Sequence, residues 1–118
     1  MNDLEAARRF ALSLPGATEE PHFGMSSFRV RGKIFATVPP DGEYLNVFVD
    51  EGEVRAAVAE DPGAFEPLLW GQRLRGLRVR VAAAGRPRTE ELLEESWLRK
   101  APARLAAGRR RARAGPNG

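Results

Sequence analysis

Apolar residues recur at helical spacing near both ends of the chain. After Asn2, which can cap a helix, they form a stripe that ends at the helix-breaking pair Pro15-Gly16. A longer stripe begins at Thr89 and predicts a second terminal helix. Pro102 is expected to kink or divide that helix. A shorter helix, capped by Asp50, is expected between these two. The chain therefore begins and ends with helices.

Between the terminal helices the period shortens to two, as expected for strands with one buried face. Residues 26–31, 33–38 and 44–49 predict an antiparallel meander, and residues 77–81 predict a further strand. Segment 18–24 is expected at most as an irregular edge strand, because it contains a proline. The fold class predicted is α+β, with an antiparallel sheet packed by the N- and C-terminal helices.

Length and charge divide the chain into one domain and a tail. With 118 residues it is long enough for one hydrophobic core. It has 19 Lys and Arg against 16 Asp and Glu, and four of the arginines lie within residues 109–113; without those four, 15 basic residues face 16 acidic ones. We expect a single domain over residues 1–107 and a basic, disordered tail over residues 108–118.

Several classes of chemistry lack the residues that they need. The chain has no cysteine, which excludes thiolate catalysis and cysteine-bound zinc. It shows neither a phosphate-binding P-loop nor a nucleophile elbow. We therefore expect no enzyme activity, cofactor or metal. The first residues lack a signal-peptide pattern and no apolar run could span a bilayer, so we expect a cytoplasmic protein without a membrane partner.

Arginines alternate with apolar residues in two of the predicted strands. Such pairs on one side of the sheet would form a basic stripe that attracts a phosphate backbone. By parity, Phe35, Tyr44 and Phe48 could lie there too and stack on unpaired bases. The alternative is a solvated polar face without a partner. The candidate nucleic-acid-binding residues are Arg29, Arg31, Lys33, Arg73, Arg75, Arg78 and Arg80.

The lone histidine marks a second candidate site. His22 has no obvious catalytic or metal-ligating partner, so it is expected to orient its loop. With Phe23 and Trp70 it could instead line a concave pocket for a small ligand or a protein partner.

Two local motifs carry a resemblance that spans most of the chain. Residues 14–24 read LPGATEEPHFG and lead into FRVRGKIFA at residues 28–36, and SW at residues 96–97 precedes APARL at residues 101–105. This pattern resembles the MmcQ/YjbR family. The resemblance implies a CyaY-like (frataxin-like) two-layer sandwich with a double-wing motif and DNA binding. It implies no catalytic residue set.

Taken together, the sequence predicts a non-enzymatic protein that binds DNA or RNA as a monomer. The alternative hypothesis is a protein-interaction or small-ligand module at the pocket near His22. Frataxin-type iron binding is not expected, because the first helix offers only Asp3 and Glu5 as carboxylates.

Overall fold

The computed structural model describes residues 3–114, with side chains described as far as residue 112. The predicted cap Asn2 lies outside the described residues. The elements in chain order are α1 (Asp3–Ser13), β1 (Ala17–His22), β2 (Met25–Val30), β3 (Lys33–Val38), β4 (Tyr44–Val47), α2 (Glu51–Glu60), β5 (Phe65–Trp70), β6 (Arg73–Arg80), α3 (Val81–Ala84), α4 (Arg86–Lys100) and α5 (Ala103–Ala114).

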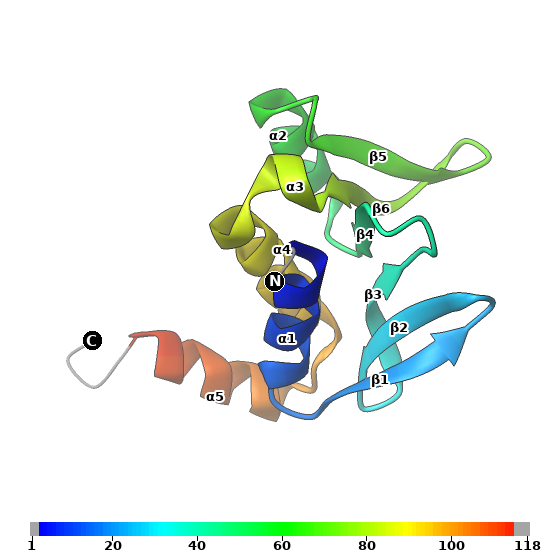
Figure 1. The fold of residues 1–118 in the computed structure, drawn as a ribbon. Coiled ribbons are helices and arrows are strands. Elements are labelled where there is room, and N and C mark those ends of the chain that lie inside the picture. Colours follow the sequence, from blue (N-terminus) through cyan, green and yellow to red (C-terminus); the bar gives the residue numbers. More distant parts are fainter. Residues whose placement is uncertain (1–2, 115–118) are drawn as a thin grey trace.

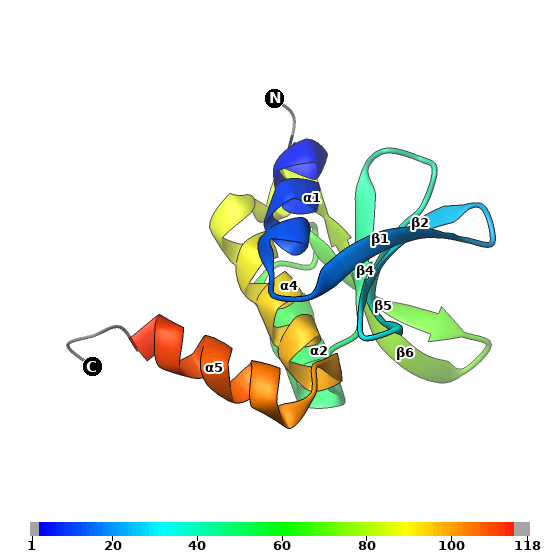
Figure 2. The ribbon, with the colours of Figure 1, turned by 90° about the horizontal axis from the view of Figure 1, so that it is seen from below.

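The six strands form one antiparallel sheet in the order β1-β2-β3-β4-β6-β5. Helices α1 and α4 lie against one face of this sheet, while the β1–β2 and β5–β6 hairpins project away from them (Figures 1 and 2). The predicted α+β class and two-layer arrangement are confirmed. In the part of the chain that the structure describes, no helix covers the opposite face of the sheet, between the two hairpins (Figures 1 and 2).

Helix α4 anchors the core because its apolar side chains face the sheet. Trp97, fully buried, donates a hydrogen bond from Nε1 to the backbone oxygen of Pro15 at 3.1 Å, which ties α4 to the end of α1. Ser96 is also buried; its hydroxyl donates to the backbone oxygen of Phe35 and accepts from the backbone N–H of Phe48 at 3.0 Å. These bonds satisfy backbone groups where strand pairing stops after β4.

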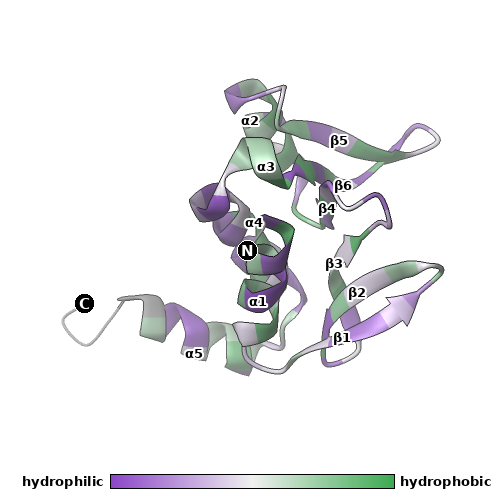
Figure 3. Cartoon of the chain, in the orientation of Figure 1, coloured by the Kyte–Doolittle hydropathy of each residue, from purple (hydrophilic) through white to green (hydrophobic). Residues whose placement is uncertain are grey.

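The strands that the sequence defined poorly lie at the two edges of the sheet. β1 is regular despite Pro21, and its six residues pair with β2 in continuous register. Figure 3 shows β1 as mostly hydrophilic, which suits an exposed edge that must not pair with another chain. β5 was not predicted as a strand. It pairs with β6, which begins at Arg73, earlier than expected.

The predictions for the helices hold in part. Asp50 caps α2 by accepting a hydrogen bond from the backbone N–H of Glu53 at 2.8 Å, as expected. The last long helix begins at Arg86 and not at Thr89, because Gly85 provides the break and Pro87 suits the first helical turn. The short helix α3 was not anticipated.

Pro102 separates α4 from α5, as predicted. The expectation of a disordered tail from residue 108 was wrong for residues 108–114, which continue α5. This helix packs on the rest of the fold through the buried Ala106 and the partly buried Leu105, and Arg109 Nε donates to a carboxylate oxygen of Glu94 at 2.7 Å. Helix α5 extends away from the sheet (Figure 2).

Candidate functional site

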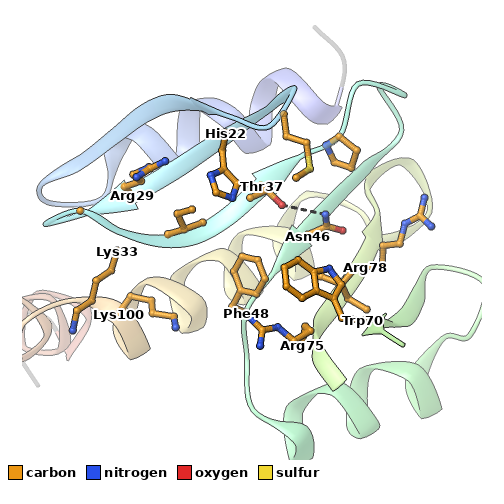
Figure 4. A pocket seen from close by; sticks show the side chains of 15 residues that line it. His22, Arg29, Lys33, Thr37, Asn46, Phe48, Trp70, Arg75, Arg78 and Lys100 are labelled. Atoms are coloured by element: carbon orange, nitrogen blue, oxygen red, sulfur yellow. Dashed lines mark hydrogen bonds between the residues drawn. The ribbon is translucent and has the colours of Figure 1, made fainter. Parts of the chain in front are cut away.

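A cavity of about 750 Å³ lies on the sheet face that no helix covers. Both hairpins, the centre of the sheet and the end of α4 contribute to it, and Figure 4 shows their side chains converging. We call it the inter-hairpin cavity. Its lining residues are His22, Met25, Arg29, Gly32, Lys33, Ile34, Thr37, Pro39, Asn46, Phe48, Leu68, Trp70, Arg75, Arg78 and Lys100.

Four of the seven predicted phosphate-contacting residues line this cavity. Arg29 and Lys33 come from β2 and β3 on one side, and Arg75 and Arg78 come from β6 on the other. One member of each predicted arginine pair therefore faces the same cavity. Lys100, at the end of α4, adds a fifth cation that the sequence analysis did not select.

The other three predicted residues do not line the cavity. Arg31 has φ +51° in the β2–β3 turn, where the chain leaves the strand geometry that would have kept it beside Arg29. Arg73 begins β6 opposite Trp70, at the end of the hairpin. Arg80 lies 3.7 Å from Glu43. Arg31 therefore lies beyond the end of β2, whereas Arg80 keeps the alternation of β6 but is not part of the cavity lining.

Two register shifts interrupt the alternation of the strands, one in β3 and one in β6. β2 skips Phe35 in its pairing with β3, and Phe35 is fully buried in the core beside Phe28. The prediction that Phe35 shares the arginine face is therefore wrong. β5 skips Arg75 in its pairing with β6, between the pairs Leu68–Gly76 and Leu69–Leu74. An unpaired bulge residue can turn its side chain out of the strand's alternation, and Arg75 lines the cavity.

The lining cations differ in their charge partners. Arg78 is held by acids: its guanidinium lies 3.1 Å from Glu66 and 3.7 Å from Asp41, and it stacks 3.9 Å from the ring centroid of Tyr44. Within the described part of the chain, no carboxylate lies within ion-pair distance of Arg29, Lys33, Arg75 or Lys100. These four cations give the cavity an uncompensated positive charge.

Aromatic side chains lie among these cations. Trp70 is 69% exposed although it is a large apolar residue, and the Arg75 guanidinium lies 4.8 Å from its ring centroid. Phe48 lines the cavity beside Trp70, and His22 reaches in from the opposite hairpin (Figure 4). Phe23 is not a lining residue; it is 92% exposed in the β1–β2 turn, at φ +48°.

Two buried polar side chains lie at the centre of the cavity lining. Asn46 on β4 donates from Nδ2 to Thr37 Oγ1 on β3 at 3.1 Å, and the two residues are cross-strand partners. Asn46 is 7% exposed, and its Oδ1 is buried without a hydrogen-bond partner. A buried unsatisfied acceptor costs stability, so such groups concentrate at functional sites. The sequence analysis missed both residues, although an asparagine between the apolar residues of a strand is an unusual choice.

The two candidate sites of the sequence analysis therefore coincide. His22 and Trp70, selected for a small-ligand pocket, line the same cavity as the four predicted phosphate contacts. Within residues 3–114, no cluster of three or more His, Asp or Glu residues could hold a metal ion, and no helix is long and apolar enough to cross a membrane. The arrangement offers positive charge, ring faces and a polar centre.

The fold and the cavity define an α+β protein whose uncovered sheet face is cationic and partly aromatic. A family model described as YjbR matches residues 12–99, and the chain belongs to that family. The crystal structure of the Deinococcus radiodurans protein DR2400, which has a DUF419 domain, is similar with a TM-score of 0.70. The likeness covers 83% of this chain and 78% of that one at 20% identity, and it shows a shared fold. No curated protein matches the sequence significantly.

Proposed function

We propose that the protein binds single-stranded nucleic acid in the inter-hairpin cavity, without catalysing a reaction. The observation that carries this proposal is the presence, in one cavity, of four cations without acidic partners and of an exposed indole. Cations along a groove attract the phosphate backbone, and ring faces stack on bases of any sequence. The same combination is typical of proteins that bind single strands.

The cavity favours a single strand over a duplex. Trp70 and Phe48 lie among the cations of the cavity lining, so a ligand that contacts the rings also lies close to the positive charges. In a duplex the ring faces of the bases are stacked on one another, and the phosphates lie outside them. An unpaired strand can turn a base toward Trp70 while its phosphates remain near Arg29 and Arg75.

The charge of the rest of the surface also supports a local site. Many arginines outside the cavity are paired with acids, as Arg8 is with Glu19 at 2.9 Å and Arg55 is with Glu51 at 2.6 Å. Other arginines lie in no ion pair within the described residues, among them Arg9, Arg31, Arg73, Arg104 and the exposed Arg110 and Arg111 of α5. Cations outside the cavity could therefore also attract a polyanion, but the cavity combines its charge with rings for stacking.

The test is fluorescence anisotropy of labelled single- and double-stranded oligonucleotides, titrated over a range of salt concentrations. The cavity variant Arg29→Gln/Arg75→Gln is compared with Arg31→Gln/Arg73→Gln, which removes the same charge from neighbouring positions that do not line the cavity. We expect tighter binding to single strands than to duplexes, with an affinity that falls steeply as salt rises. Only the cavity variant should make this dependence shallower, by an amount that corresponds to about two phosphate contacts. Equal losses in both variants, or no binding at low salt, would overturn the proposal.

A further inference from the structure

The two lysines of this chain line the same cavity although they are far apart in the sequence. The protein has 17 arginines and only two lysines, Lys33 and Lys100. Lys33 begins β3 and Lys100 ends α4, and both belong to the cavity lining. Elsewhere arginine supplies the basic side chains, including those of α5. Lysine is therefore confined to this site.

The lysines occupy one end of the cavity. In Figure 4 both side chains extend to the side opposite Arg78, with Phe48, Trp70 and Asn46 between. Within the described residues neither ammonium group has a carboxylate at ion-pair distance. The cavity thus has two parts. The two ammonium groups form one end, and the aromatic rings and the Asn46 amide form the region next to it.

Lysine and arginine bind anions in different ways. The guanidinium of arginine is a rigid planar fork, whereas the ammonium of lysine is a compact point charge with three donors that rotate freely. Two such groups from separate elements can approach one phosphate from different directions. Charge-assisted hydrogen bonds of this kind are about twice as strong as neutral ones.

We propose that the cavity holds one nucleotide unit, with its phosphate bound by Lys33 and Lys100 and its base against Trp70 and Phe48. The choice of a nucleotide rests on the proposed function. The cavity volume of about 750 Å³ lies within the range of about 300 to 1,000 Å³ found for small-molecule sites. Asn46 and Thr37 line the cavity beside the rings (Figure 4), so the edge of a base stacked there would lie near this polar pair.

The experiment is isothermal titration calorimetry of the full chain with adenosine 5′-monophosphate, adenosine and inorganic phosphate. We expect the monophosphate to bind at least about tenfold more tightly than adenosine, because a charged hydrogen bond contributes roughly 1.5 kcal/mol or more. Lys33→Gln/Lys100→Gln should abolish this preference. Arg31→Gln/Arg73→Gln, which removes the same charge outside the cavity, should preserve it. Thermal unfolding of each variant shows that the fold is retained.

The outcomes separate this inference from the proposed function. If oligonucleotides bind and the monophosphate does not, or if the lysine variant binds as the unchanged protein does, the inference is overturned and strand binding stands. If the monophosphate binds through the lysines but no oligonucleotide competes with it, the cavity is a mononucleotide site and strand binding is overturned. Lysine-dependent binding of the monophosphate that single strands displace supports both.

Discussion

The guanidinium of Arg75 lies 4.8 Å from the ring centroid of Trp70, within the β5–β6 hairpin. Arg75 is the bulge residue of β6, so the same irregularity that turns its side chain toward the cavity also places it over the indole. Trp70 nevertheless remains largely exposed. The hairpin thus presents a ring that is oriented before any ligand arrives, and this lowers the entropic cost of stacking a base on it.

Replacing Trp70 with alanine should weaken binding without weakening the fold. Stacking on one base contributes about 1–3 kcal/mol, which corresponds to a loss of roughly tenfold to a hundredfold in affinity. Because the side chain is exposed, the free energy of unfolding should change by about 0.5 kcal/mol or less. Anisotropy with a single-stranded oligonucleotide and urea unfolding measure the two effects.

The matched control is Leu69→Ala, because Leu69 is also exposed, at 53%, and is not a cavity-lining residue. It should bind as the unchanged protein does. A similar loss of affinity in both variants would show that general hydrophobic contact, and not stacking on the indole, is responsible.

Thr37 and Asn46, the polar pair at the centre of the cavity, should be coupled in their contribution to stability and should support binding. Thr37→Val alone removes the acceptor of the Asn46 amide, and we expect it to destabilise the fold by about 1–3 kcal/mol. Thr37→Val/Asn46→Leu removes the whole pair, and it should destabilise by less than the sum of the single changes. Urea unfolding of the unchanged protein, of Thr37→Val, of Asn46→Leu and of the double variant closes this cycle.

The same double variant should bind nucleotides less tightly, since it loses the polar atoms that meet the base edge. A variant that is as stable as the unchanged protein but binds less tightly would show that the pair is kept for function. Unchanged binding would mean that Asn46 and Thr37 serve only the fold.

Gly76 permits the close approach of β6 to the chain around the end of β4. A Cβ at this position would meet the backbone oxygen of Val47 and would lie 3.2 Å from the Phe48 ring. Gly76→Ala should therefore destabilise the fold by about 1–3 kcal/mol, as overpacking does. Thermal unfolding checks this. Gly108→Ala in α5, whose Cβ would meet only the end of the Arg111 side chain, at 3.9 Å, should instead be stabilising by up to about 1 kcal/mol.

Truncating the chain after residue 107, within α5, should leave binding in the cavity intact. The truncation eliminates four arginines and the contact of Arg109 with Glu94. We expect lower affinity for all oligonucleotides and a shallower salt dependence, since these charges add attraction without base contacts. The loss on Trp70→Ala should persist in the truncated chain. Complete loss of binding on truncation would assign the interaction to α5.

The sequence was informative where alternation and helix signals were unbroken. The strand over residues 33–38 and the capping of α2 by Asp50 were predicted from local patterns alone. Whether Arg29 and Arg78 lie on one side of the sheet was left open by the sequence, because it depends on how β2 and β6 are placed in the sheet; both line the cavity.

The sequence was uninformative where a bulge or a distant segment decides the outcome. No local signal indicates that the pairing skips Phe35 and Arg75, because a bulge depends on both strands of a pair. Lys100 reaches the cavity from a helix that follows the last strand, so its place depends on how α4 packs. The scarcity of lysine in an arginine-rich chain was visible in the composition and could have drawn attention to it.

The two tryptophans allow the most direct measurement. Their indole N–H resonances in a ¹H–¹⁵N spectrum report on the cavity and on the core separately. Trp70 lines the cavity, whereas Trp97 is buried and its indole N–H donates a hydrogen bond to the backbone oxygen of Pro15. On titration with a single-stranded oligonucleotide, the Trp70 resonance should shift and saturate while the Trp97 resonance stays in place. Binding without any change at Trp70 would contradict the account, because the strand would then lie outside the inter-hairpin cavity.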